Sequence, residues 1–422
     1  MKRYIIIGNS AAGISAAEAI RKKDKESRIA MISDEDYPSY CRCLISYYLA
    51  GDIKEKEILY RADSFYKENN IELILNKKIT RVEPKKNAVY FEDKTKHEFD
   101  SLLIATGSSP KMPEIKGIDK KGVYGFRTIR DAKELNTLVA ASKPACISGG
   151  GLVGLKAAYA LKKRGLKVKV IVKSGQVLSQ VLDREAAQLV QNKLESNGVE
   201  LIFGHDVAEV VGEDNIKALK LDSGKTIEAS ILIVSKGVAP NIDMVSGTDI
   251  KVNEGIIADN TLRTAVPNIY AAGDVCEAYD ITLKAGCVNA LWPIAVWQGR
   301  VAGANMAGEK VKYEGSLGMN SLEFFGLPTM SFGIFKVKDG QGFEEIKLKN
   351  AKAGTYKKFV IKNNRLVGVV LAGKVANGGI FLRLIKDGID IVPFRDRLTE
   401  ESFGYPDIIE HIKGKDKENM YV

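Results

Sequence analysis

The sequence contains no uninterrupted apolar run of about 20 residues, the length that crosses a bilayer, so we expect no membrane-spanning helix and no membrane partner. It is also poor in cysteine. Five cysteines, an odd number, are dispersed over 422 residues, and only Cys41 and Cys43 lie close together. This pattern excludes a disulfide framework and favours a reducing, cytoplasmic location. No cluster of residues has the spacing of metal ligands, so we expect no metal site.

Acidic residues are outnumbered by basic ones, 53 against 63, which gives a formal net charge of +10. The excess predicts a basic face, which either aids solubility or attracts an acidic partner. No basic run is interleaved with aromatic residues and no nucleic-acid-binding motif is present, so we expect no nucleic-acid partner. With 45% apolar residues, a chain of this length can form several cores, and we expect two to four domains.

Strand-like apolar runs alternate with helix-like segments over the first two-thirds of the chain. A run at 4–7 ends at Gly8, small residues then recur at helical spacing, and a second run follows at 29–32. A second unit of this kind opens with the run at 145–148. The repeated strand–helix–strand pattern predicts an α/β fold with parallel sheets and two Rossmann-like, three-layer nucleotide-binding domains. Beyond about residue 313, short alternating segments predict a small α+β domain.

The first of two glycine-containing loops reads Gly8-Asn9-Ser10-Ala11-Ala12-Gly13. The pyrophosphate of a dinucleotide binds at a helix N-terminus, where only small residues let it approach the backbone. Ser10 stands where the middle glycine is usual. An acidic residue about 20 positions later should bind the ribose hydroxyls, and Asp34 and Glu35 are the candidates.

The second loop reads Gly149-Gly150-Gly151-Leu152-Val153-Gly154 and fits the dinucleotide fingerprint fully. The strand that follows ends in Val172-Lys173-Ser174, without an acidic residue. Because Lys173 tolerates a 2′-phosphate, the segment slightly favours NADPH and leaves NADH open. A solvated Lys173 with no role in binding is the alternative. One chain with two such loops can hold a flavin and a visiting nicotinamide cofactor.

Three further segments resemble the FAD-dependent pyridine-nucleotide oxidoreductase superfamily, and the likeness covers nearly the whole chain. They are residues 103–110, 234–241 and 267–274. The resemblance implies that Asp274 binds the ribityl chain of FAD and that Gly273 lets the backbone approach the flavin. It also implies four segments, with a homodimer through the last as a family-level expectation. They are a split FAD domain over 1–110 and 242–312, an NAD(P) domain over 111–241 and an interface domain over 313–422.

The segment Pro38–Tyr48 resembles two groups within this superfamily. Read around Cys43, it resembles the single-cysteine CoA-disulfide reductases and NADH oxidases, in which the cysteine is a redox thiol beside the flavin. Read around Arg42 and Ser46, it resembles the rubredoxin, ferredoxin and nitrite reductase-type flavoproteins, in which the arginine contacts FAD. Cys43 is therefore either a redox thiol or a small residue packed near the flavin, and the segment leaves both open.

The C-terminal third favours the electron-transfer group, which segments 291–300 and 315–321 resemble. Within them, Trp292 either shields the flavin or belongs to the core. Lys156 replaces a glutamate that many relatives place near the nicotinamide, so it either alters cofactor preference or points outward. The two-cysteine disulfide reductases are excluded because they need a Cys-x4-Cys pair, which Cys41 and Cys43 cannot supply.

We therefore predict an enzyme that passes electrons between NADH or NADPH and a small acidic iron–sulfur carrier through FAD, in either direction. The alternative is a thiol-dependent enzyme using Cys43, and a non-catalytic flavoprotein is a third hypothesis. The residues expected to bind FAD are Gly8, Ser10, Ala11, Ala12, Gly13, Asp34, Glu35, Arg42, Cys43, Ser46, Ala105, Thr106, Gly107, Gly273, Asp274 and Trp292. Those expected to bind NAD(P)H are Gly149, Gly151, Leu152, Val153, Gly154, Lys156, Lys173 and Gly237.

Overall fold

The computed structural model describes residues 1–139, 144–338 and 340–412. Contacts divide the chain into two compact units. Unit 1 comprises Met1–Glu114, Tyr124–Ser142 and Val234–Ser316, and unit 2 comprises Ile115–Val123, Lys143–Ile233 and Leu317–Val422. This division groups residues 124–142 with the FAD-type segments, whereas the sequence assigned 111–241 to one NAD(P) domain. The four-segment division stays a prediction.

Unit 1 is built on a five-stranded parallel sheet in the order β19-β7-β1-β2-β3. Strand β7 is buried along its whole length and β1 from its second residue on, which is why both read as apolar runs. The strands are β19 (Ile269–Ala271), β7 (Ser101–Ile104), β1 (Arg3–Ile7), β2 (Arg28–Ile32) and β3 (Ile71–Ile74).

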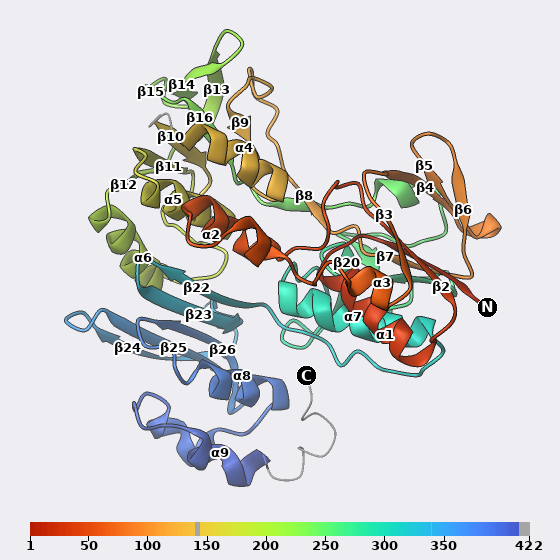
Figure 1. Ribbon diagram of the computed structural model, residues 1–422. Helices are drawn as coiled ribbons and strands as arrows, with labels where there is room; N and C mark the ends of the chain where they lie inside the picture. Colours follow the sequence, from red (N-terminus) through yellow and green to blue (C-terminus); the bar gives the residue numbers. More distant parts are fainter. Residues whose placement is uncertain (140–143, 339, 413–422) are drawn as a thin grey trace. The chain divides into compact units, whose positions relative to one another are not determined.

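Helices α1 (Ala11–Lys23) and α7 (Trp292–Met306) pack side by side in unit 1 (Figure 1). Their backbones come so close that a Cβ on Gly299 would lie 2.2 Å from the carbonyl oxygen of Ala12. This contact joins the start of the chain to a helix almost 300 residues later. The other helices of unit 1 are α2 (Ile45–Ala50), α3 (Phe65–Glu68) and α4 (Ile129–Val139).

Smaller sheets complete unit 1. One pairs β8 (Ser108–Pro110) with β17 (Val238–Pro240) in antiparallel orientation, so the two segments that resembled crossovers in the sequence lie side by side. Another contains β4 (Ile79–Glu83), β5 (Ala88–Phe91) and β6 (Lys96–Glu98). A third contains β18 (Ile256–Ile257), β20 (Cys276–Asp280) and β21 (Ala285–Cys287).

Unit 2 contains a second five-stranded sheet, in the order β12-β11-β10-β16-β9, in which β10, β11 and β12 are parallel. Its strands are β12 (Val199–Phe203), β11 (Val168–Val172), β10 (Ala145–Ser148), β16 (Ile231–Val234) and β9 (Val123–Tyr124). Helix α5 (Leu152–Lys163) packs against β10 and β11, and helix α6 (Arg184–Ser196) packs against β12. An antiparallel sheet of β13 (Val207–Gly212), β14 (Ile216–Leu221) and β15 (Thr226–Glu228) follows.

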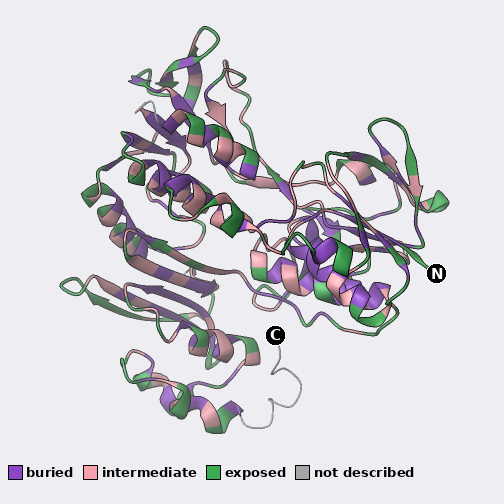
Figure 2. Cartoon of the chain, in the orientation of Figure 1, coloured by how far each residue is buried: buried purple, intermediate pink, exposed green. Residues whose placement is uncertain are grey.

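The C-terminal part of unit 2 is an antiparallel sheet in the order β22-β23-β26-β25-β24, with two helices. Figure 2 shows buried residues along the strands of this sheet and of the parallel sheets. The elements are β22 (Met319–Phe324), β23 (Leu327–Gly333), β24 (Glu344–Asn350), β25 (Thr355–Lys362), β26 (Arg365–Ala372), α8 (Gly378–Asp387) and α9 (Tyr405–Ile412).

These elements confirm the predicted α/β class with a smaller α+β domain at the C-terminal end. The segment predicted over 313–422 is described as far as residue 412. In the described parts of the chain, no helix combines the length and apolar character needed to cross a membrane.

Candidate functional site

The first glycine loop joins the central strand β1 to helix α1. Gly8 has a φ of +124°, and a Cβ there would lie 2.1 Å from the carbonyl oxygen of Ala105, so only glycine fits. Ser10 caps α1 in an extended conformation, but its side chain makes no capping hydrogen bond, and the first turn contains no acidic residue. Among the described residues, no side chain therefore accepts from the first amides of α1, which leaves them available to a phosphate group.

Two buried polar atoms beside this loop have no partner among the described residues. They are Nδ2 of Asn9 and Oγ of Ser39. Tyr66 holds both residues, since its hydroxyl donates to Oδ1 of Asn9 at 2.8 Å and accepts the Ser39 amide at 3.0 Å. A buried polar group without a partner costs about 1–3 kcal/mol, so this pair fits a polar ligand such as a dinucleotide. Asn9 lies inside the predicted loop but was not predicted as a binding residue, and its polar side chain was the signal in the sequence that could have identified it.

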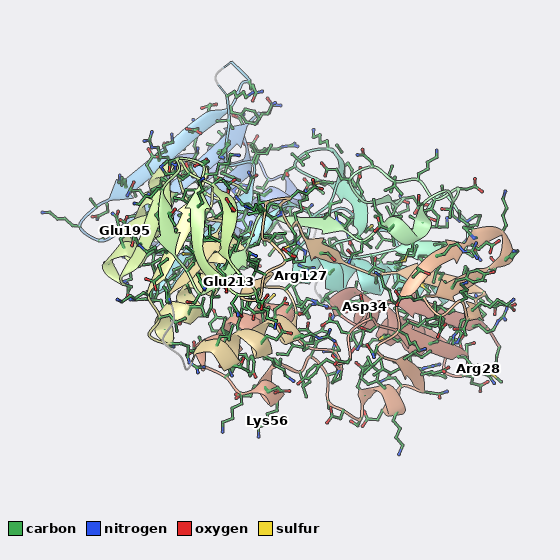
Figure 3. All side chains as sticks on the ribbon, turned by 90° about the horizontal axis from the view of Figure 1, so that it is seen from above. Arg28, Asp34, Lys56, Arg127, Glu195 and Glu213 are labelled. Atoms are coloured by element: carbon green, nitrogen blue, oxygen red, sulfur yellow. The ribbon has the colours of Figure 1, made fainter. Side chains whose placement is uncertain are left out.

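The two acidic candidates after β2 differ in their surroundings. Asp34 is exposed and labelled in Figure 3. Glu35 is partly buried, where it forms an ion pair with Arg42 and accepts the Tyr40 hydroxyl at 2.6 Å. Arg42 also donates to the Tyr40 hydroxyl at 2.9 Å, and burial raises the pKa of Tyr40, which keeps it a donor. The structure therefore pairs two of the predicted FAD residues, Glu35 and Arg42, whereas the Asp34 side chain is exposed and does not belong to this ion pair.

Asp274 lies just after β19 and has two partners that the sequence did not reveal. Its Oδ2 accepts from Arg127 Nη2 at 2.7 Å and from Ser108 Oγ at 3.0 Å, and its side chain is only 15% exposed. Arg127 is labelled in Figure 3. The preceding Gly273 donates its amide to Oε1 of the buried Gln298 at 2.8 Å. No local motif signals these partners, because Arg127 stands 147 positions away.

The predicted crossover residues 105–107 meet the segment that ends at Asn241. Thr106 donates its hydroxyl to the Asn241 carbonyl at 2.9 Å, and the Asn241 side chain donates to the Thr106 carbonyl at 2.9 Å. Gly237, predicted to bind NAD(P)H, also lies in unit 1, where its carbonyl accepts the Lys111 amide at 2.9 Å. Since the second glycine loop belongs to unit 2, the role of Gly237 stays a prediction.

Cys41 and Cys43 lie at a short 3₁₀ turn, Arg42–Leu44, that leads into α2. Cys43 is exposed and Cys41 is partly buried. The Cys43 thiol, together with the amides of Cys43 and Leu44, lowers the pKa of Cys41 to about 7. The interaction with the neighbouring Cys41 thiol raises the pKa of Cys43. Thiolate character therefore favours Cys41, and a redox role for Cys43 stays a prediction.

Two other predicted FAD residues lie on helices of unit 1. Ser46 is buried on α2. Trp292 begins α7, lies partly buried against the core and makes an edge-to-face contact with Tyr60 at a centroid distance of 5.0 Å. The contact with Tyr60 fixes the orientation of the indole ring, and the shielding of the flavin by Trp292 stays a prediction.

The second glycine loop joins β10 to α5 in unit 2. Gly151 caps α5 in an extended conformation without a side-chain hydrogen bond, and the first turn again has no acidic residue. Ser148, the last residue of β10, has a buried hydroxyl with no partner among the described residues. This helix end suits a pyrophosphate, and the binding roles of Gly149 and residues 151–154 stay a prediction.

The two predicted lysines of this unit are held by different elements. Lys156 donates to the Glu323 carbonyl at 2.9 Å and lies over the ring of Phe324, so it reaches the C-terminal sheet. Lys173 follows β11, with its side chain 76% exposed and its Nζ 3.7 Å from Oδ2 of Asp206. Sequence reasoning did not identify Asp206, which belongs to the loop after the next strand.

Comparisons with known proteins fit this arrangement. A family model described as pyridine nucleotide-disulphide oxidoreductase matches residues 2–299, and one described as rubredoxin NAD+ reductase C-terminal domain matches residues 319–389. The chain is 35% identical over 395 residues to a nitrite reductase [NAD(P)H] of Bacillus subtilis (strain 168), covering 92% of this chain and 48% of that protein. It thus spans about half the length of that relative.

Two further similarities extend over nearly the whole chain. It is 31% identical over 400 residues to the epsilon subunit of the NADH-dependent phenylglyoxylate dehydrogenase of Aromatoleum evansii, covering 94% of each. A solved covalent complex of putidaredoxin reductase with putidaredoxin contains a chain of the same fold, with a TM-score of 0.89 and 21% identity. That comparison covers 98% of this chain and 99% of the other.

Proposed function

Since the chain belongs to the pyridine nucleotide-disulphide oxidoreductase family, we propose that it passes electrons between a nicotinamide dinucleotide and a small acidic iron–sulfur protein. The membership confirms the predicted family, the predicted enzyme class and the predicted cofactors, FAD and NAD(P)H. The iron–sulfur partner is the proposed part. The match of residues 319–389 to a rubredoxin reductase domain supports it.

The observation that carries the proposal is the presence of two uncapped helix N-termini, each after a parallel strand and a glycine loop. In unit 1, the amides that start α1 and the buried Asn9 and Ser39 would hold FAD. In unit 2, the amides that start α5 would hold the nicotinamide dinucleotide. FAD, when bound, supplies the exchange between hydride transfer and single-electron transfer.

The chain's own residues prepare the FAD site electrostatically. Arg127 and Ser108 fix the Asp274 carboxylate in one orientation, and one oxygen remains outside those two hydrogen bonds. A carboxylate with a free acceptor suits a hydroxyl-bearing chain such as ribityl. Arg42 in turn fixes Glu35, the acidic residue proposed for the ribose hydroxyls. Because each carboxylate is paired with an arginine, the site holds both without net negative charge.

A thiol-dependent activity is the second candidate, and the pair formed by Cys41 and Cys43 is the observation that favours it. The two cysteines flank Arg42 at one turn, the pKa of Cys41 is lowered, and Cys43 is exposed. A disulfide, polysulfide or dioxygen acceptor would then take electrons through Cys43. Against this, the interaction between the two thiols lowers the pKa of Cys41 and raises that of Cys43, so the exposed sulfur is the poorer thiolate.

The test is an anaerobic NAD(P)H titration followed by turnover with purified ferredoxin and rubredoxin. The main proposal expects uptake of two electrons per flavin, unchanged in Cys43→Ser, and rapid carrier reduction. The carrier kcat/KM should fall steeply as NaCl rises from about 0.01 M to about 1 M, because the screening length shrinks from about 30 Å to about 3 Å. Extra electrons that disappear in Cys43→Ser would establish the thiol activity instead. A carrier rate that ignores salt would refute the acidic-partner argument.

A further inference from the structure

The corner that follows β11 decides which nicotinamide dinucleotide unit 2 accepts. In dinucleotide-binding folds, an acidic residue after the second strand binds the ribose 2′-hydroxyl of NADH, and a basic residue there accommodates the 2′-phosphate of NADPH. In this chain Lys173 and Ser174 follow that strand, so the sequence places no carboxylate at the expected position. The structure supplies one from a different segment.

That carboxylate is Asp206, in the loop between β12 and β13. Strands β11 and β12 are parallel, with Val172 in register with Phe203, so both end at the same edge of the sheet. The chain then turns at Gly204, whose amide donates to the Val172 carbonyl at 2.9 Å. This turn carries Asp206 across the end of β11, where its Oδ2 lies 3.7 Å from Nζ of Lys173.

The two members of this ion pair are held very differently. The Asp206 side chain is 24% exposed, and its Oδ1 accepts the Val207 amide at 2.8 Å. Its carbonyl accepts the Asp222 amide at 3.0 Å, so backbone and carboxylate are both fixed. The Lys173 side chain is 76% exposed, and a flexible four-carbon stem carries its charge. At the end of β11, the group with a fixed position is therefore the Asp206 carboxylate, and the Lys173 ammonium adjusts its position to that carboxylate.

We propose that Asp206 is the acidic residue of the second dinucleotide site and that it selects NADH over NADPH. A ribose hydroxyl can donate a hydrogen bond to a fixed carboxylate. The 2′-phosphate of NADPH carries nearly two negative charges. To pair with Lys173, this phosphate would have to take the place of the Asp206 carboxylate and would then lie close to it. Repulsion between the phosphate and the carboxylate therefore opposes the binding of NADPH. This inference rests on the proposed binding of a nicotinamide dinucleotide at the start of α5. It reverses the slight preference for NADPH that the sequence suggested.

The experiment compares the purified full-length protein with Asp206→Asn, using NADH and NADPH and an artificial electron acceptor. We expect the wild type to prefer NADH. The substituted amide keeps an acceptor for the Val207 N–H but loses the charge, so the ratio of kcat/KM for NADH over NADPH should fall by about 5- to 30-fold. Lys173→Gln should move the ratio the other way, because it removes the lysine that attracts the phosphate at this corner.

A matched control removes the same charge from the same region. Asp222 is 47% exposed and lies 3.1 Å from Nδ1 of His205, so Asp222→Asn should leave the cofactor ratio unchanged. Calorimetric titration with adenosine 2′,5′-bisphosphate and with 5′-AMP gives a readout that does not depend on catalysis. Asp206→Asn should tighten binding of the bisphosphate and weaken binding of 5′-AMP, because the 2′-hydroxyl of 5′-AMP loses the carboxylate that accepts its hydrogen bond.

The inference is overturned if the wild type prefers NADPH. It is also overturned if Asp206→Asn changes neither the kcat/KM ratio nor the relative binding of the two adenosine fragments, or if Asp222→Asn changes them as much as Asp206→Asn does. Failure of the proposed function looks different. In that case the nucleotides would still reduce the flavin and the artificial acceptor, with a ratio that reports on Asp206, but no variant would reduce an iron–sulfur carrier.

Discussion

Replacing Lys358 with methionine should loosen the attachment of the C-terminal sheet to helix α6. Lys358 lies on β25, and its side chain is only 5% exposed. Its Nζ is 2.5 Å from Oε1 of Glu345 and 3.7 Å from Oδ2 of Asp183, and it donates to the Phe335 carbonyl at 2.9 Å. Asp183 caps α6 through the Ala186 amide at 3.2 Å, so the lysine connects two secondary-structure layers of unit 2.

The magnitude follows from burial. Removing one partner of a buried ion pair costs about 3–5 kcal/mol, because the Asp183 carboxylate, whose side chain is 9% exposed, stays out of water without its cation. The matched control is Lys347→Met, since Lys347 lies 2.6 Å from the same Glu345 but is 44% exposed. An exposed pair is worth about 0.2–1 kcal/mol. Both variants remove one cation from the same glutamate, but only Lys358→Met also removes the buried cation beside Asp183.

Native-state hydrogen exchange is the appropriate assay, because a chain of several domains need not unfold in one step. In Lys358→Met, amides of β25 and of the first turn of α6 should exchange roughly two to three orders of magnitude faster. In Lys347→Met the increase should stay below about tenfold. Equal effects of the two variants would refute the argument that burial sets the cost. Amides of unit 1 provide the internal reference.

Two further predictions concern unit 1. Arg127→Ala should weaken FAD retention by about tenfold or more, because it removes the side chain that lies 2.7 Å from the Asp274 carboxylate. The measurement is the flavin absorbance that remains after dialysis. The control Arg130→Ala breaks only an exposed ion pair and should leave this absorbance unchanged. Alkylation of Cys41, followed by peptide mass spectrometry, should rise with pH around a midpoint near 7, since its lowered pKa yields thiolate above that pH. Cys43→Ala should move the midpoint upward, and a midpoint that did not move would contradict the role of the Cys43 side chain in lowering the pKa of Cys41.

The local chemistry of the two glycine loops could be inferred from the sequence alone. An apolar run that ends at a glycine and continues at helical spacing specifies a strand, a tight turn and a helix start, all within about 25 residues. The φ of +124° at Gly8 and the uncapped start of α1 match that inference. Only backbone conformation and near neighbours are involved, so the FAD and NAD(P)H sites could be predicted without knowing the neighbouring strands.

The partners of the charged residues depend instead on which segments the tertiary structure brings together. Arg127 reaches Asp274 across 147 positions, and Asp206 reaches the end of β11 only because β12 is its parallel neighbour. Lys156 meets the carbonyl of Glu323 because the C-terminal sheet belongs to the same unit as α5. An ion pair or hydrogen bond needs atoms within a few ångströms, and sequence spacing does not report that distance for residues on different strands. The sequence therefore determined the two glycine loops and the helix starts that follow them, and the tertiary structure decided which charges surround them.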